Sequence, residues 1–105
     1  MVEVVNMRTC DPPWGQPGDV RIDRATQWGN PYPITDVDTR LQVIGKYSFY
    51  LKAAIERKEL DIREIANAKR LGCWCKPKAC HGDVLKKAID EHNKSVKDRK
   101  QKRLF

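Results

Sequence analysis

The sequence predicts a single α/β domain, with a small, mainly parallel or mixed sheet of about three strands packed with about three helices. The first observation is the order of segments along the chain: strand, strand, helix, helix, strand, helix. The second is that two apolar strands, residues 2–8 and 71–75, are separated by helical segments, which favours parallel strands joined by right-handed crossovers. The third is the length of 105 residues, 40% of them hydrophobic, which suits one modest core.

The N-terminal third of the chain predicts two strands, each followed by a loop. Residues 2–8 are rich in β-branched side chains and roughly alternate in polarity, as a strand does. Residues 9–19 are dense in proline, glycine and aspartate and predict a loop. Residues 20–23 alternate between apolar and charged side chains and predict a short second strand. Residues 24–34 combine glycine with two prolines and predict a stiff second loop.

Helical periodicity begins near residue 38 and extends to about residue 58. Its expected buried face is an apolar stripe at helical spacing: Leu41, Ile44, Tyr47, Leu51 and Ile55. Either Asp36 or Asp38 is expected to cap the first turn, because a carboxylate can accept hydrogen bonds from the free N–H groups there. Residues 61–68 predict a second, short helix.

The last predicted strand and the last helix enclose a tight turn that carries most of the reactive side chains. Residues 71–75 form the strand, a Lys-Pro-Lys turn follows, and the helix shows apolar residues at Val84, Leu85, Ala88 and Ile89. Cys73, inside the strand, is expected to be a small buried side chain. Trp74 points to the opposite face and is expected to pack against a helix.

Residues 1–92 are predicted to form the domain, and residues 93–105 a basic C-terminal tail that is flexible or a fraying helix end. The net charge is +7, and the tail holds six of the 21 basic residues with one acidic residue. Such a tail can hold nucleic-acid phosphates without sequence specificity, or be a solvated helix end. No apolar run approaches the roughly 20 residues that span a bilayer, so no membrane partner is expected. Without a signal-peptide pattern, a cytoplasmic protein with reduced thiols is predicted.

Cys80, His81 and Asp83 are the candidate catalytic residues. Ligands of parallel α/β sheets bind at the carboxyl ends of the strands, and the strand ending at Cys75 leads into this turn. A cysteine at a helix N-terminus has its thiol pKa lowered by the helix dipole and by free backbone donors. The same donors would bind a phosphate, with Gly82 allowing close approach. Asp83 is expected to act as a general base, or only to stabilise the first turn of the helix.

The loop containing Trp-Gly-Asn-Pro supplies further candidate ligand-binding residues. Aromatic rings can stack on a heterocycle, amide side chains match base edges, and an arginine pairs with phosphate. The candidates are Arg24, Gln27, Trp28, Asn30 and Tyr32, together with Cys75 and Gly82 from the turn. The alternative is a rigid proline-framed loop whose tryptophan fills the end of the core.

No metal site is favoured by the spacing of the cysteines. Cys73 and Cys75 would share one face of a strand about 6.5–7 Å apart, a strained distance for chelating one ion. Cys80 and His81 are adjacent and would usually point in different directions. If a metal is bound, zinc is the ion that thiolates and imidazole suit, and the ligand set would be Cys10, Cys75, Cys80 and His81. Apart from this zinc alternative, the sequence leaves the cofactor unknown.

Three segments of the chain resemble the family described as domain of unknown function 4326. They are residues 24–32, the helical residues Arg40, Val43, Ile44 and Tyr47, and residues 71–85 with their Cys-Trp-Cys and Cys-His-Gly-Asp motifs. Members of that family are small proteins of phages and bacteria. The resemblance extends to about Ile89 and implies a compact α/β domain, in the host cytoplasm if phage-encoded. It implies no reaction, because the family is named for lacking one.

The leading interpretation is a small cytosolic domain that binds a nucleotide or nucleobase-like ligand where residues 24–32 meet residues 75–83. A glycosidic or group transfer on a nucleoside is a reaction such a site could carry. The alternative is a non-enzymatic module that binds zinc or nucleic acid. Both interpretations remain open at this point, as does the question whether the protein is an enzyme.

Overall fold

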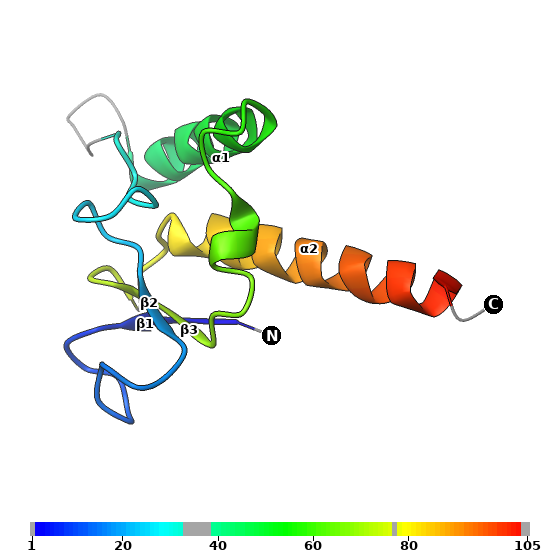
Figure 1. The fold of residues 1–105 in the computed structure, drawn as a ribbon. Helices are drawn as coiled ribbons and strands as arrows, with labels where there is room; N and C mark the ends of the chain where they lie inside the picture. Colours follow the sequence, from blue (N-terminus) through cyan, green and yellow to red (C-terminus); the bar gives the residue numbers. More distant parts are fainter. Residues whose placement is uncertain (1, 33–38, 77, 104–105) are drawn as a thin grey trace.

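The computed structural model describes residues 2–32, 39–76 and 78–103, and for residues 97–103 it describes the backbone alone. The elements in chain order are β1 (Glu3–Asn6), β2 (Asp19–Arg21), α1 (Arg40–Glu56), the 3-10 helix η1 (Ile62–Glu64), β3 (Arg70–Cys73) and α2 (Gly82–Arg103) (Figure 1). The predicted α/β class is confirmed. Two α-helices and one short 3-10 helix stand where about three helices were expected.

The sheet has three strands in the order β1-β3-β2, and both pairings are parallel. The central strand is therefore the last one in the sequence, with Leu71 paired to Val4 on one side and to Val20 on the other. Since all three strands point the same way, their carboxyl ends share one edge of the sheet.

Helices cover one face of the sheet and a loop covers the other. α2 contacts β1, β3, η1 and α1, and Figure 1 shows both α-helices on the same side of the strands. Leu71 and Cys73 are buried in the core cluster that also contains Leu85 and Ile89 of α2. Residues 7–18 cross from β1 to β2 over the opposite face, where the indole of Trp14 lies close above Gly72.

The N-cap of helix α1 lies one residue after Asp38, the later of the two expected capping residues. This N-cap is Thr39, whose hydroxyl accepts from the backbone N–H of Gln42 while the Gln42 side chain accepts from the Thr39 N–H. Asp36 and Asp38 lie outside the described residues. The buried face contains Val43, Tyr47, Leu51 and Ala54. Leu41 was wrongly placed in the buried stripe: it is 73% exposed, because it lies in the first turn, away from α2.

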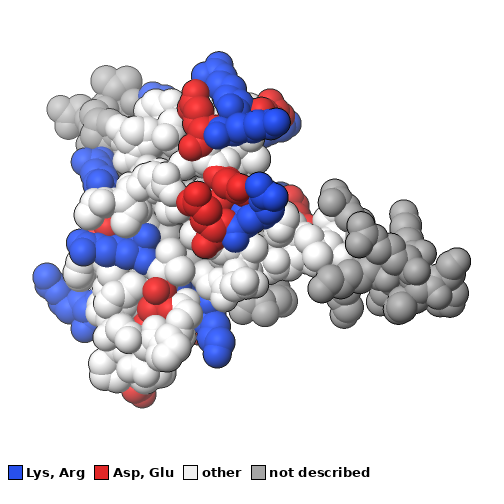
Figure 2. Space-filling model, viewed as in Figure 1, with Lys and Arg blue, Asp and Glu red and all other residues white. Residues whose placement is uncertain are grey.

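Helix α2 continues through the predicted tail boundary at residue 93 and its backbone remains helical to Arg103. Its last turns extend beyond the sheet and α1 (Figure 1). On the face shown in Figure 2, basic and acidic side chains lie side by side over α1 and η1. Among the helices of the described chain, none has the length and apolar character needed to cross a membrane.

The ion pair between Arg70 of β3 and Asp19 of β2 joins two strands, and the same two side chains also hydrogen-bond to the crossing loop. Two guanidinium nitrogens of Arg70 donate to the two carboxylate oxygens of Asp19, each at 2.7 Å, and a third donates to the carbonyl of Pro12 at 2.9 Å. The carboxylate also accepts from the backbone N–H groups of Gly15 and Gln16. Hydrogen bonds from Arg70 hold the pKa of Asp19 at about 2, although burial opposes this shift.

This ion pair predicts a loss of stability in acid. The folded-state pKa of Asp19 lies below its unfolded value of about 3.9, so the stabilisation is fully present above about pH 4 and is lost as the pH falls toward 2. In Arg70→Met, thermal melting temperatures at neutral pH should be lower and should fall less between about pH 4 and 2 than in the wild type. The matched control is Arg63→Met, because the side chains of the Arg63–Asp61 pair are 77% and 40% exposed, so solvent screens this pair and its loss should change stability little at any of these pH values. An unchanged pH slope in Arg70→Met would contradict the prediction.

Candidate functional site

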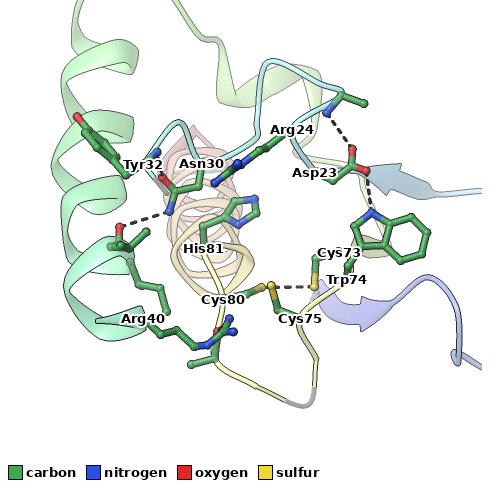
Figure 3. Close-up of a pocket in the computed structure, with 14 residues that line it drawn as sticks. Asp23, Arg24, Asn30, Tyr32, Arg40, Cys73, Trp74, Cys75, Cys80 and His81 are labelled. Atoms are coloured by element: carbon green, nitrogen blue, oxygen red, sulfur yellow. Dashed lines mark hydrogen bonds between the residues drawn. The ribbon is translucent and has the colours of Figure 1, made fainter. Parts of the chain in front are cut away.

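A pocket of about 350 Å³ opens at the carboxyl edge of the sheet. Three parts of the chain build it: the loop after β2, the first turns of α1, and the turn between β3 and α2. The lining residues are Asp23, Arg24, Ala25, Asn30, Tyr32, Arg40, Val43, Ile44, Cys73, Trp74, Cys75, Ala79, Cys80 and His81. Figure 3 shows these segments converging on one space. Its volume lies in the range of small-molecule sites.

Two thiols meet beside the pocket, where the turn brings the start of α2 back to the end of β3. The Sγ atoms of Cys73 and Cys80 are 3.4 Å apart, and Cys80 donates to Cys73 (Figure 3). This hydrogen bond, aided by backbone N–H groups of Cys75 and Lys76, lowers the pKa of the Cys73 thiol against the effect of burial. The pKa of Cys80 is raised, first by its bond to Cys73 and then by burial. The Cys73 sulfur also lies 3.6 Å from the carbonyl oxygen of Val5, to which its own S–H donates when Cys73 is protonated.

His81 is a neutral imidazole at the side of the pocket. Its Nε2 atom lies 2.6 Å from the carbonyl oxygen of Ile22, and its ring meets the edge of Tyr47 with the ring centroids 4.9 Å apart. Burial lowers the pKa of His81 below its usual value. A carbonyl can only accept, so the proton of the neutral ring is on Nε2, and Nδ1 is left as an acceptor.

Two arginines bring positive charge to the pocket from different elements. Arg24 follows β2 and points toward the space between Asn30 and His81 (Figure 3). Arg40 comes from the first turn of α1, and its Nη1 donates to the carbonyl of Ala79 at 3.2 Å. The nearby carboxylate of Asp23 is engaged elsewhere, by hydrogen bonds from Arg21 and the indole of Trp74. In the part of the chain that the structure describes, no carboxylate pairs with Arg24.

Internal hydrogen bonds hold the loop of residues 24–32 against α1. The Asn30 side chain donates to the carbonyl of Val43 at 3.3 Å and accepts from the N–H of Tyr32 at 2.9 Å. The hydroxyl of Tyr47 donates to the carbonyl of Trp28 at 2.7 Å. Asn30 therefore positions Tyr32 beside the pocket, and only part of its hydrogen-bonding capacity remains for a ligand.

The structure brings six of the predicted site residues together and leaves four outside the lining. Arg24, Asn30, Tyr32, Cys75, Cys80 and His81 line the pocket. Trp28 is buried in the core, and Gln27 donates to Glu64 on η1. Gly82 is enclosed by Val4 and Ile22.

Asp83 is the fourth residue outside the lining, and its carboxylate stabilises the start of α2. It pairs with Lys76 at 2.6 Å and accepts from the backbone N–H of Cys80 at 3.2 Å. These contacts match the alternative role expected for it, that of an acidic residue in the first turn.

The four residues named for a metal site do not converge. Cys10 lies outside this pocket, on a shallow surface with Asn6 and Lys76. His81 directs its Nε2 to a backbone carbonyl. Among the described residues, no group of three or more histidine, cysteine, aspartate or glutamate side chains is arranged to hold a metal ion.

Several lining residues were not assigned to the site from sequence. Cys73 was expected only in the core, and Trp74 was wrongly expected to pack against a helix. The Trp74 ring is half-exposed, its Nε1 donates to Asp23 at 2.9 Å, and the Arg8 guanidinium lies 6.0 Å from its ring centroid. Strand β3 ends at Cys73, so the alternation of strand faces does not extend to Trp74, which lines the same pocket as Cys73 and Cys75. Val43 and Ile44 follow Arg40 on α1, and only the packing of that helix brings them here.

Comparisons with known proteins find a family model and a phage relative, and the description of neither names an activity. A family model described as "Domain of unknown function (DUF4326)" matches residues 5–91. The chain is also 38% identical over 69 residues to an "Uncharacterized 12.4 kDa protein in nrdA-td intergenic region" of Enterobacteria phage T4. That alignment covers 64% of this chain and 63% of the phage protein, so the chain spans less than two thirds of its relative. No solved structure matches the chain.

Proposed function

Since the chain belongs to the family described as domain of unknown function (DUF4326), we propose its function from the pocket: it binds a nucleotide or a nucleobase-like ligand that carries a phosphate. The observation that carries this proposal is the pair of arginines, Arg24 and Arg40, beside an otherwise largely apolar pocket at the carboxyl edge of a parallel sheet. Arginine recognises phosphate through paired hydrogen bonds, and parallel sheets bind ligands at this edge.

The walls of the pocket support an orientation for such a ligand. Val43 and Ile44 of α1 give an apolar wall, and the Tyr32 ring stands beside it in edge contact with Tyr50. A heterocycle is proposed to lie against this wall, where it would leave water and stack on Tyr32. The phosphate would then face Arg24 and Arg40 (Figure 3). The arginine charge would replace the hydration that the phosphate loses on binding.

If the protein acts on its ligand, the reacting groups on this chain are His81 and the thiol pair. The Nδ1 atom of His81 is an acceptor and would serve as a general base. Cys73 and Cys80 supply two thiols whose sulfurs are 3.4 Å apart at the pocket. Asp83 is committed to Lys76 and to the start of α2 and has no part in this proposal.

The test is a thermal-shift screen of the full chain against nucleosides and their mono-, di- and triphosphates. A ligand at 100 times its dissociation constant should add about 2.7 kcal/mol to the free energy of unfolding. Arg24→Ala or Arg40→Ala should weaken binding of the phosphorylated compounds about ten- to hundredfold, since a hydrogen bond to a charged group contributes about 1.5–3 kcal/mol. The matched control is Arg57→Ala, an exposed arginine at the end of α1, which should bind as the wild type does.

Three results would count against the proposal. If no compound in the library raises the melting temperature, the proposal is wrong. If the wild type and Arg24→Ala bind the phosphorylated compounds with equal affinity, Arg24 does not contact the phosphate. Truncation after Asn93 removes the basic end of α2 but no residue that lines the pocket, so nucleotide binding should persist. If binding is lost with that truncation, the phosphate-binding function belongs to the helix end, as in the nucleic-acid-binding alternative.

A further inference from the structure

The buried thiol pair is a feature that nucleotide binding does not use. Cys73 is the last residue of β3, and Cys80 stands two residues before α2. Their side chains are 1% and 2% exposed, yet both line the pocket. A small molecule that enters the pocket can therefore approach sulfur atoms that the rest of the surface conceals.

We propose that Cys73 and Cys80 form a dithiol–disulfide pair that a small peroxide oxidises through the pocket, with Cys73 as the attacking thiol and Cys80 as the resolving thiol. The 3.4 Å between the two Sγ atoms carries the proposal, because the sulfurs are already in contact. A disulfide requires about 2 Å, so closing the remaining distance is a side-chain movement. The two residues are separated by a turn and not by a strand, which allows that movement.

The hydrogen bond between the two sulfurs is the basis on which the two roles are proposed. The S–H of Cys80 points at the Cys73 sulfur, which accepts this hydrogen bond as a thiolate, whereas a protonated Cys73 directs its own S–H to the carbonyl of Val5. The backbone N–H of Gly82 donates to the sulfur of Cys80 at 3.2 Å and lowers the pKa of that thiol, but the bond to Cys73 and burial raise it by more. The thiolate is the nucleophilic form of cysteine, so Cys73 reacts first. The protonated neighbour is then already in place to react second.

Each step balances with hydrogen peroxide as the oxidant. The Cys73 thiolate attacks one peroxide oxygen, the O–O bond breaks, hydroxide leaves, and Cys73 becomes a sulfenic acid. The Cys80 sulfur then attacks the Cys73 sulfur, the S–S bond forms and the S–O bond breaks. The Cys80 proton leaves with the departing oxygen as water. The net change is the oxidation of two thiols to one disulfide and the reduction of one peroxide to two water molecules.

The other two cysteines serve as controls. Cys75 is partly exposed in the same pocket, and Cys10 lies on a different surface. Among the described contacts, neither makes a hydrogen bond to another sulfur, although Cys75 lies near enough to Cys80 to raise its pKa. If exposure alone governed oxidation, Cys75 and Cys10 would be modified before the buried pair.

The test treats the folded full chain with hydrogen peroxide and maps its cysteines by mass spectrometry without reduction. The wild type, Cys75→Ser and Cys10→Ser should each lose two hydrogen atoms and yield a peptide cross-linked between Cys73 and Cys80. In Cys80→Ser, a dione probe that traps sulfenic acids should label Cys73. A disulfide that contains Cys75 or Cys10, or no disulfide while the wild type stays folded, would overturn the proposal.

Two features keep the test decisive. The wild-type peptide map stands even if a cysteine variant folds poorly, because it needs no substitution. No nucleotide is present, so the result is independent of the nucleotide-binding proposal. The Cys80→Ser protein should melt at the wild-type temperature. If the dione then labels Cys75 and not Cys73, Cys73 is not the attacking thiol.

Discussion

Leu71→Ala is expected to lower the free energy of unfolding by about 2–5 kcal/mol, the usual cost of removing a buried leucine side chain. Leu71 is 0% exposed at the centre of the central strand, between Val4 and Val20. It faces α2, so its truncation leaves a cavity between the sheet and the helix that the neighbouring side chains can fill only in part. Since a domain of this size is stable by only about 5–15 kcal/mol, part of the variant should be unfolded at moderate urea concentrations.

Leu41→Ala is the matched control for this experiment. The chemical change is the same, but Leu41 is 73% exposed on the outer side of α1 and should change the free energy of unfolding by about 0.5 kcal/mol or less. Urea unfolding followed by tryptophan fluorescence measures both variants. Equal effects in the two variants would mean that β3 does not pack against α2 as described.

Gly72→Ala is expected to cost about 1–3 kcal/mol, although it adds only a methyl group. A Cβ at this position would lie 2.4 Å from Cη2 of Trp14 and 2.6 Å from Cγ of Met7. Neither distance is compatible with van der Waals contact, so Trp14 and the crossing loop must move. The variant should therefore also change the fluorescence of the folded protein, because an indole that packs on the sheet is displaced.

Gly45→Ala provides the opposite control. Gly45 lies within α1, and a Cβ there meets no atom within 4 Å. Alanine should stabilise the helix by about 0.5–1 kcal/mol, because glycine loses more backbone freedom on folding. The two glycine variants should thus shift the urea midpoint in opposite directions. A destabilised Gly45→Ala or a neutral Gly72→Ala would contradict the described packing.

Much of the fold follows from local patterns in the sequence. The β-branched residues near Val5 and the apolar run through Leu71 identified the outer and central strands, and the two aligned in parallel as expected. The boundaries were less well determined, since Thr39 and not an aspartate caps α1. An N-cap stands where the chain enters the helix. Asp36, Asp38 and Thr39 all have side chains that can cap a helix, so the local sequence does not distinguish between them.

The site shows a similar division between local and long-range information. The segments that meet at the pocket were identified because loops at the carboxyl ends of parallel strands share an edge. Individual roles changed with packing: Asn30 and Asp83 satisfy backbone groups, and Trp28 fills the core. Sequence spacing does not reveal such partners, because each lies on another element or depends on how the turn closes.

The sequence alone determined the α/β class, the approximate segments, the family and the edge of the sheet where its unusual motifs gather, because periodicity and residue type report burial and turns locally. The tertiary structure decided that β3 lies between β1 and β2, that Arg40 joins Arg24 at the pocket, and that Cys73 meets Cys80. These facts depend on strand order and on the docking of α1 and α2. Such contacts form between residues distant in the chain, where local patterns carry little information.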